Sequence, residues 1–331
     1  MRYDRTVLVT GGGGYVGSHA CKTFALNGWN VVTFDDLSRG TRDAVRWGPL
    51  IEGNLLDRNA ITHAIGDVKP DLVAHFAAFA YVGESVDRPE IYYRNNSVGT
   101  LNLLDAMLHS TVNSVIFSST CASYGVPSYL PINEAHPQSP INPYGWSKMI
   151  VERMLEDYGR AHGLRSVCLR YFNAAGADID GDIGEQHVPE THAVPLAIEA
   201  ALNPSAPFTV FGTDFDTPDG SAIRDYIHVS DLAHAHLMAA DFLRDHAGNH
   251  IYNLGTGTGT SVLELLAAVE DAVGIAPGRI MGPRRAGDPA SLVASYDKAQ
   301  AELGWTPQRS DIRTIVQTAL AWRQSRDTAL R

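Results

Sequence analysis

Short apolar runs alternate with stretches of helical periodicity from residue 5 to about residue 172. Such runs predict buried β-strands, which we expect at residues 5–10, 30–34, 72–77, 114–118 and 166–171. The segment after Tyr144 has the i, i+3, i+4, i+7 spacing of a helix, at Val151, Met154, Leu155 and Tyr158. Strands that alternate with helices are typical of a parallel sheet covered on both faces. The pattern therefore predicts an α/β fold with a doubly wound parallel sheet.

The pattern changes near residue 174. Residues 177–189 and 212–221 are polar and rich in glycine, which predicts two long loops. Ser261 and Glu264 form a capping box ahead of apolar residues at helical spacing, namely Val262, Leu265, Leu266 and Val269. We therefore predict a sheet domain at residues 1–173 and a smaller mixed α/β domain at residues 174–331. Segments near residues 226–255 are expected to cross back to the first domain.

Glycines follow the first predicted strand with the spacing G-x-x-G-x-x-G, at Gly11, Gly14 and Gly17, and a helical segment comes next. Strand, glycine turn and helix together are typical of a Rossmann-type site, where a pyrophosphate binds at the helix N-terminus. Asp35 and Asp36 end the second strand, close to twenty residues later. A carboxylate there accepts the ribose hydroxyls of adenosine and repels a 2′-phosphate. The pattern favours NAD over NADP, although Arg39 argues the other way.

Tyr144 and Lys148 are four residues apart, so both lie on one face of the predicted helix. A free tyrosine is a poor base at neutral pH, but a nearby positive charge favours the phenolate. In a dry site, a phenolate can take a proton from a hydroxyl group. The pair is thus a candidate catalytic base with its supporting cation.

Ordered blocks over nearly the whole chain resemble the extended short-chain dehydrogenase/reductase family, and within it the UDP-glucose 4-epimerases. The matching blocks are residues 9–19, 75–78, 82–86, 92–96, 117–120, 143–148, 169–173, 224–229 and 285–288. The resemblance implies that Tyr144 is the base, that Lys148 holds the nicotinamide ribose and lowers the tyrosine pKa, and that Thr120 hydrogen-bonds the reacting sugar oxygen.

The same resemblance implies the binding residues. The cofactor candidates are Gly11, Gly14, Tyr15, Val16, Gly17, Asp35, Asp36, Asn54, Leu55, Phe76, Ala77, Ala78, Asn95, Ser118, Tyr144, Lys148 and Tyr171. The nucleotide-sugar candidates are Thr120, Cys121, Asn173, His192, Ala193, Phe211, Arg224, Tyr226, Arg285, Asp288 and Leu292. Arg224 and Arg285 are expected at the diphosphate, because a planar guanidinium makes bidentate contacts to phosphate.

The implied activity is that of an NAD-dependent isomerase. It would interconvert UDP-glucose and UDP-galactose through a 4-keto intermediate. A dehydratase is disfavoured, because residues 121–123 after Thr120 offer no acid–base pair. A non-enzymatic NAD-binding sensor is disfavoured because Tyr144, Lys148 and Thr120 are all present.

Four residues depart from the family pattern. Ala80 stands where many members have a lysine that reaches the cofactor phosphates, and Asn54 replaces an aspartate beside the adenine. His192 stands where an asparagine is often found near the sugar. Leu292 occupies a pocket position that is often a bulky tyrosine. A smaller residue leaves open an N-acetylhexosamine or a pentose as the sugar.

Composition excludes several classes of function. The 331 residues carry a net charge of −11 without a basic run, so nucleic acid is not an expected partner. The longest apolar run, residues 72–82, is too short to span a bilayer, and the N-terminus lacks the pattern of a signal peptide. A cytoplasmic enzyme is expected, and the family resemblance implies a homodimer.

No metal is expected. The three cysteines, Cys21, Cys121 and Cys168, lack metal-ligand spacing and are expected to be reduced. His234 and His236 point to different faces of a predicted helix. Glu185 and His187, like His192, fall in a predicted loop, where we expect solvated side chains.

Overall fold

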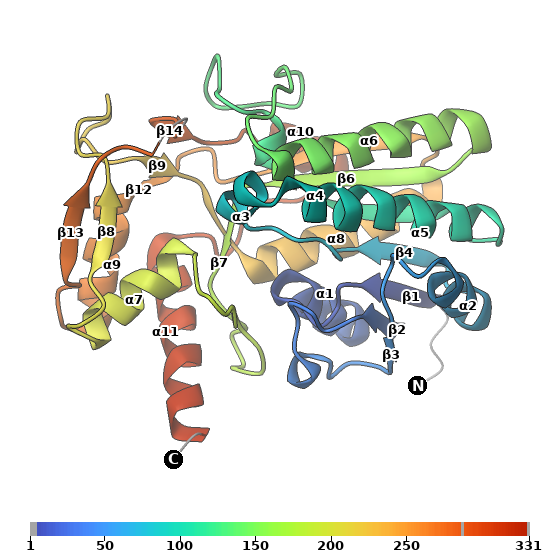
Figure 1. The fold of residues 1–331 in the computed structure, drawn as a ribbon, viewed down its shortest axis with the longest axis horizontal. Coiled ribbons are helices and arrows are strands. Elements are labelled where there is room, and N and C mark those ends of the chain that lie inside the picture. The colour runs from blue at the N-terminus through green and yellow to red at the C-terminus, as the bar shows by residue number, and fades with distance from the viewer. Residues whose placement is uncertain (1–4, 286–287, 330–331) are drawn as a thin grey trace.

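The computed structural model describes residues 5–285 and 288–329. Its largest element is a parallel sheet of seven strands in the order β11-β6-β5-β4-β1-β2-β3 (Figure 1). The strands are β1 (Arg5–Thr10), β2 (Trp29–Asp35), β3 (Leu50–Glu52), β4 (Leu72–His75), β5 (Ser114–Thr120), β6 (Arg165–Tyr171) and β11 (Asn249–Leu254). The predicted doubly wound parallel sheet is confirmed.

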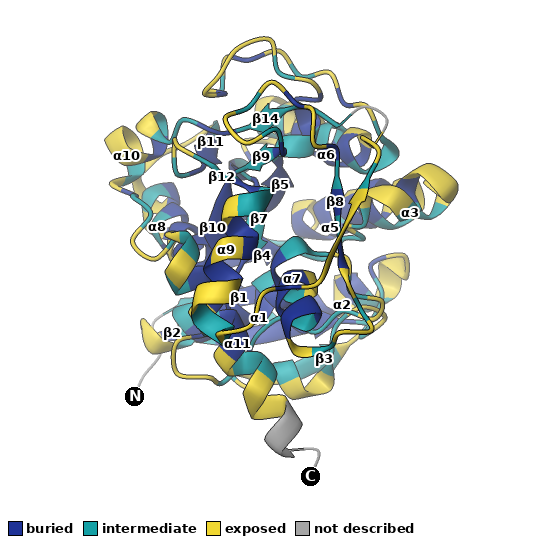
Figure 2. Ribbon diagram, turned by 90° about the vertical axis from the view of Figure 1, so that its left-hand side faces the viewer, coloured by how far each residue is buried: buried dark blue, intermediate teal, exposed yellow. Residues whose placement is uncertain are grey.

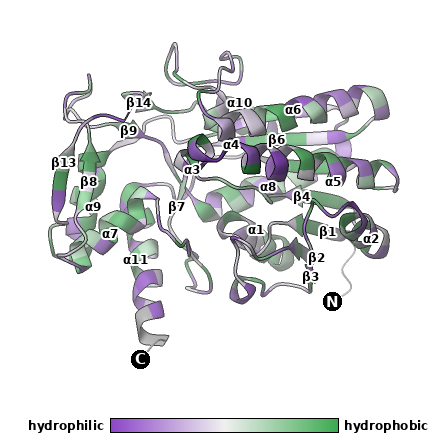
Figure 3. Cartoon of the chain, in the orientation of Figure 1, coloured by the Kyte–Doolittle hydropathy of each residue, from purple (hydrophilic) through white to green (hydrophobic). Residues whose placement is uncertain are grey.

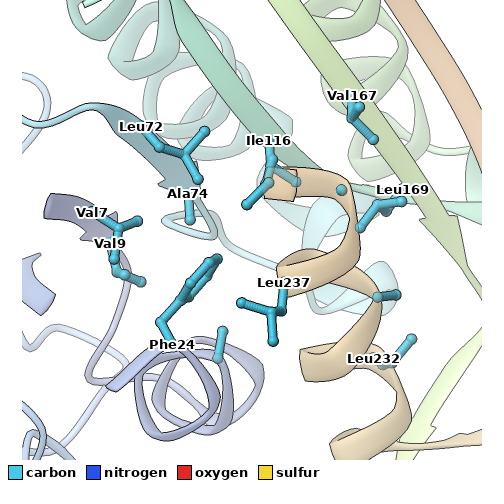
Figure 4. Close-up of a cluster of buried hydrophobic side chains, with 14 of the residues drawn as sticks. Val7, Val9, Phe24, Leu72, Ala74, Ile116, Val167, Leu169, Leu232 and Leu237 are labelled. Atoms are coloured by element: carbon cyan, nitrogen blue, oxygen red, sulfur yellow. The ribbon is translucent and has the colours of Figure 1, made fainter. Parts of the chain in front are cut away.

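Helices cover both faces of this sheet, because successive side chains of a strand point to opposite sides. In β1, Val7 and Val9 pack with α1 (Tyr15–Leu26) and α8 (Val229–Asp245), whereas Leu8 packs with the helices of the other face. Figure 4 shows Phe24 and Leu237 meeting between the strands and these two helices. The second face carries α2 (Arg58–Val68), α5 (Gly99–Leu108) and α6 (Pro143–His162).

Shorter helical elements connect these layers. They are η1 (Arg42–Ala44), α3 (Val82–Asp87), α4 (Pro89–Tyr92), the π-helical turn η2 (Tyr93–Val98), η3 (Cys121–Ser123) and α10 (Asp297–Leu303). The central strands of the large sheet are mostly buried, whereas the edge strand β3 is partly exposed and the helices carry exposed residues on their outer sides (Figure 2).

A second core lies around three helices, α7 (Ala193–Leu202), α9 (Val262–Val273) and α11 (Ile312–Ala329). In Figure 3, hydrophobic residues are concentrated along α7, α9 and β8. The short strands of this region are β7 (Asn173–Ala175), β8 (Phe208–Phe211), β9 (Ile223–Arg224), β10 (Tyr226–His228), β12 (Thr260–Ser261), β13 (Arg279–Gly282) and β14 (Ser291–Leu292). The capping box predicted at Ser261 and Glu264 is present, and α9 begins immediately after it.

Two predicted strand ends are displaced. β4 ends at His75 rather than near residue 77, because the amides of Phe76 and Ala77 both donate to Thr10 O and leave the ladder. β5 continues through Thr120, which pairs with Tyr171 of β6, instead of ending near residue 118.

Part of the C-terminal half lies against the large sheet. β11 joins the sheet beside β6, and α8 contacts α1. Trp305, after α10, also belongs to the core on that face. The division at residue 173 stays a prediction, as do the segments expected to cross back.

Candidate active site

One cavity of about 990 Å³ lies where β1, β2, β4, β5 and β6 end, and the β7–α7 loop forms part of its wall. Ligands bind at this edge of open parallel sheets. All the catalytic, cofactor and nucleotide-sugar candidates from the sequence, far apart along the chain, lie on the wall of this cavity. Their roles in binding and catalysis stay predictions. In the block at residues 285–288, Ala286 and Gly287 lie outside the described residues.

The glycine turn forms a cradle that side chains would fill. Gly11 has φ +77°, and a Cβ there would lie 2.5 Å from the backbone nitrogen of Ala77. A Cβ on Gly17 would lie 2.2 Å from the carbonyl oxygen of Gly11. The N-cap of α1 is Gly14, which provides no capping side chain. The first amides of α1 are thus left to a ligand, and a pyrophosphate suits this positive helix end.

The carboxylate of Asp35 lies at the edge of this cradle. It accepts hydrogen bonds from the amides of Gly13 at 2.9 Å and Leu37 at 2.8 Å. Burial raises the pKa of Asp35, and these two amides lower it in part. Anchored in this way, the carboxylate faces the cavity as an acceptor for hydroxyl groups.

Arg39, which argued against NAD, and Asn54, which departs from the family pattern, both have partners nearby. Arg39 donates to both carboxylate oxygens of Glu84, at 2.7 and 2.8 Å, and its guanidinium lies 4.8 Å above the Phe79 ring. Asn54 donates to Asp36 Oδ2 at 2.6 Å, so its amide holds that carboxylate in place. The cradle and the acidic edge fit NAD.

The catalytic candidates lie on α6 and at the end of β5. Asn142 caps α6 by accepting a hydrogen bond from the amide of Gly145 at 2.8 Å, and Tyr144 and Lys148 follow one turn apart. Lys148 is 3% exposed and donates to Ser118 O at 2.8 Å. Its Nζ lies 5.9 Å from the centre of the Tyr144 ring.

Burial controls the charge of both groups. It lowers the pKa of Lys148 to about 7, and the carboxylate of Glu152 raises that pKa in part. Burial also raises the pKa of Tyr144. Tyr171 raises this pKa further, and a hydrogen bond with Thr120 lowers it in part. The dry pocket thus disfavours the charged form of each group, and the lowering of the tyrosine pKa by Lys148 stays a prediction.

A buried ion pair supports this part of α6. Glu152, one turn after Lys148, accepts from Arg170 Nε at 2.9 Å, and Arg170 Nη2 donates to its other oxygen at 2.5 Å. The two side chains are only 4% and 3% exposed. Ser119 also donates to Glu152, and Arg170 Nη1 donates to the Tyr124 hydroxyl at 2.8 Å. The network ties α6 to β5 and β6.

The other end of the cavity is basic and aromatic. Arg224 donates to the carbonyl oxygens of Ile223 at 2.8 Å and Pro289 at 3.0 Å, and it forms an ion pair with Asp288. The guanidinium of Arg285 lies 3.9 Å from the centre of the Phe211 ring. Two guanidinium groups at one end of the cavity suit a diphosphate.

The sugar region lies between these two ends. Leu292 contacts the cluster of Phe172 and Tyr124. Burial raises the pKa of Tyr226 to about 12, so its phenol stays neutral. Asn173 donates to Asp225 O at 3.2 Å and faces the same cavity.

The sequence-based expectation for the β7–α7 loop is wrong. Glu185, His187 and His192 are not separate solvated side chains, because the Glu185 side chain is 6% exposed and contacts both imidazoles. Glu190 completes the group, and His187 and His192 line the cavity. The sequence signal for this group was the spacing E-x-H-x-x-E-x-H, which the prediction of solvated loop side chains left unused.

All three cysteines are free. Burial raises the pKa of the Cys121 thiol to about 12, which argues against a reactive thiolate beside the cavity. Among the described residues, no helix is long and apolar enough to cross a membrane.

Comparisons with known proteins agree with this geometry. The model of the NAD-dependent epimerase/dehydratase family matches residues 7–255. The UDP-glucose 4-epimerase of Rhizobium meliloti (strain 1021) is 51% identical over 325 residues, which cover 98% of this chain and 98% of the relative. The crystal structure of UDP-glucose 4-epimerase from Brucella ovis in complex with NAD has a TM-score of 0.93 and 51% identity, with 96% and 97% of the two chains covered. The enzyme from Bifidobacterium longum in complex with NAD⁺ and UDP has a TM-score of 0.92 and 37% identity, with 97% and 99% covered.

Proposed function

Because this chain belongs to the NAD-dependent epimerase/dehydratase family, we propose that its reaction is the interconversion of UDP-glucose and UDP-galactose at C4 of the sugar. The chain is an isomerase of the UDP-glucose 4-epimerase type, and its cofactor is NAD. One observation carries the assignment of the site. A single cavity is lined by Thr120, Tyr144 and Lys148, by the glycine turn and by two arginines.

The dinucleotide end would hold NAD through the glycine turn, the first amides of α1 and the carboxylate of Asp35. When bound, NAD supplies the oxidation and reduction at C4, which passes through a 4-keto sugar. The protein must hold the sugar so that either face of C4 can react.

Tyr144 takes the proton of the C4 hydroxyl and later returns it to the same oxygen. Burial raises its pKa, so the phenolate that accepts this proton needs a positive charge beside it, which the charged form of Lys148 supplies with Nζ 5.9 Å from the ring centre. The hydrogen bond with Thr120 lowers that pKa and orients the phenol. Thr120 can at the same time contact the reacting sugar oxygen, since a hydroxyl both donates and accepts.

Lys148 supplies an adjustable positive charge. With a pKa of about 7, its amine gains or loses a proton near neutral pH. Its bond to Ser118 O holds the amine at the floor of the cavity, where it is placed to donate to a ribose. Glu152 favours its charged form.

Arg224 and Arg285 would hold the diphosphate. The ion pair with Asp288 fixes Arg224, and the Phe211 ring supports Arg285. Preset guanidinium groups lose little side-chain entropy on binding. The substrate is thereby anchored at its diphosphate, and the sugar is left free to present either face.

A second candidate is 4-epimerisation of a UDP-N-acetylhexosamine or a UDP-pentose. Leu292 favours it, because this aliphatic side chain lies on the cavity wall where a bulky tyrosine would restrict the sugar. The alternative shares every other residue with the first assignment.

Exposed apolar residues on neighbouring helices support a homodimer. Leu101 and Leu108 of α5 are 37% and 44% exposed, and Trp146 of α6 is 43% exposed. Apolar side chains gathered on one face are typical of a protein interface. We therefore propose that a second copy of the chain covers α5 and α6, which sedimentation of wild type and Trp146→Glu would test.

Free cysteines and the use of NAD support a cytoplasmic location.

The test is an NMR product assay on purified protein without added NAD. UDP-galactose, UDP-N-acetylgalactosamine and UDP-arabinose are offered in parallel. Conversion to the C4 epimer is expected, and the fastest sugar decides between the two candidates. Failure on all three sugars after NAD is supplied would refute the epimerase assignment.

A further inference from the structure

The loop between β7 and α7 carries two clusters of charged side chains, and only the first contains its own cation. Asp178, Asp180 and Asp182 each accept a hydrogen bond from Lys22 Nζ, at 2.7, 2.8 and 2.8 Å. The ammonium of Lys22 thus fills the position that a bound cation would take among three carboxylates.

The second cluster, which we call the EHEH cluster, consists of Glu185, His187, Glu190 and His192. Each residue offers one ligand atom, and these four atoms all lie within 4.8 Å of one another. His187 Nδ1 is 2.9 Å from Glu185 Oε1 and 3.9 Å from Glu190 Oε1. His192 Nδ1 contacts Glu185 and is 4.0 Å from Glu190 Oε1.

These separations suit a tetrahedral metal. Ligands bound at about 2.0–2.2 Å to one zinc ion lie roughly 3.4 Å from one another. The separations of 2.9, 3.9 and 4.0 Å bracket that value. The contacts of Glu185 with His192 and with His187 must lengthen to admit an ion, and all three side chains belong to one loop.

Within the part of the chain that the structure describes, no lysine or arginine forms an ion pair with the EHEH cluster. The ion-pair partners that the described residues give Glu185 and Glu190 are the two imidazoles. Glu185 is nearly buried, and a buried carboxylate needs a cation beside it. With neutral imidazoles, two carboxylates carry two negative charges, which one divalent ion neutralises.

We propose that the EHEH cluster binds one divalent transition-metal ion, with zinc preferred. Imidazole and carboxylate ligands suit zinc, and the spacing H-x₄-H of His187 and His192 falls within the range seen in zinc sites. Four protein ligands form a closed site, so the ion is structural and takes no part in the chemistry at C4.

The ion would fix the loop beside the cofactor end of the cavity. The His187 ring lies 6.3 Å from the Tyr15 ring and 5.7 Å from the Tyr81 ring. Tyr15, at the start of α1, donates to Gly176 O at 2.5 Å. A metal on His187 would thereby hold the loop against the glycine turn.

The test uses the full chain with its cofactor, stripped with chelator, then given zinc chloride and dialysed against metal-free buffer. We expect one equivalent of zinc to remain, measured by mass spectrometry, and the melting temperature to rise. Cobalt in place of zinc should produce the strong visible absorption of a tetrahedral site. None of these readouts requires epimerase activity, so failure here leaves the proposed function intact.

Two variants locate the site. Glu190→Gln removes the charge but keeps an oxygen that can accept from the amides of Thr191 and His192, as Glu190 does at 2.7 and 2.8 Å. His187→Asn removes one nitrogen ligand and serves if the first variant folds poorly. His63→Asn changes an exposed histidine on α2 and is the control. Zinc lost from both cluster variants and kept by the control supports the site. Zinc absent from the wild type, or held equally by all variants, overturns it and leaves a cluster held by protonated imidazoles.

Discussion

Replacing Arg170 with methionine tests the buried ion pair behind the catalytic helix. The substitution removes the bonds to Glu152 at 2.9 and 2.5 Å and the bond to Tyr124 at 2.8 Å. Glu152 keeps hydrogen bonds from Ser119 and Gln138 but loses its only ion-pair partner among the described residues. Both side chains of the pair are nearly inaccessible, so solvent cannot replace the guanidinium.

The expected cost is large. Leaving one member of a buried pair without its partner costs about 3–5 kcal/mol. The Tyr124 hydroxyl loses a donor but still donates to Asn253 at 2.6 Å, which adds at most about 1 kcal/mol. At an unfolding entropy of about 2.1 cal/mol/K per residue, a loss of about 4 kcal/mol corresponds to a fall of roughly 6 °C in the melting temperature of the 331 residues.

The assay is urea unfolding at a fixed excess of NAD, because a ligand of the folded state shifts apparent stability. Glu152→Met should cost a similar amount, since it strands the guanidinium. The double variant should recover most of the loss, because a packed apolar pair replaces a desolvated ionic one at little net cost. Free energies that simply add in the double variant would refute the reasoning, since independent residues add and paired residues do not.

Three further predictions concern the cavity. Tyr144→Phe should keep NAD bound and lower turnover by about 10²–10⁴-fold, measured by NMR product formation, because the phenol proton carrier is lost; unchanged turnover would exclude Tyr144 as the base. The wild type should gain roughly 2–3 kcal/mol of stability between pH 7 and pH 9 through Lys148. The pKa of this lysine is about 7 in the folded chain, whereas its ordinary value, expected in the unfolded chain, is 10.5. The unfolded chain binds more protons in that window, so stability rises with pH, and Lys148→Met should abolish the rise in urea titrations. Gly17→Ala should abolish NAD binding in calorimetry, because its Cβ would lie 2.2 Å from the oxygen of Gly11; Gly66→Ala, which meets no atom within 4 Å, should bind NAD normally.

Local patterns in the sequence were enough to predict the α/β scaffold. Apolar runs predicted the strands, and the spacing of Tyr144 and Lys148 correctly placed both on one helix. The capping box at Ser261 was equally visible. These features depend on neighbouring residues and on the periods of helix and strand, which a single chain displays directly.

The sequence pattern predicted the ends of the strands less accurately than their positions. β5 extends through Thr120 because that residue pairs with Tyr171 of β6, a strand that follows α6 in the chain. The amides of Phe76 and Ala77 leave the ladder because both turn toward Thr10 O. Hydrogen bonds between distant segments decide such boundaries, and periodicity does not reveal them.

The sequence by itself therefore determined the α/β scaffold, the glycine turn and the two catalytic candidates on one helix face. Only the tertiary structure decided that Glu152 pairs with Arg170, that Lys22 fills the aspartate cluster and that the EHEH cluster gathers in a loop. It also decided the protonation of Lys148, whose pKa falls because the fold removes water from it. Burial and long-range partners follow from how distant segments pack together, whereas local order follows from adjacent residues.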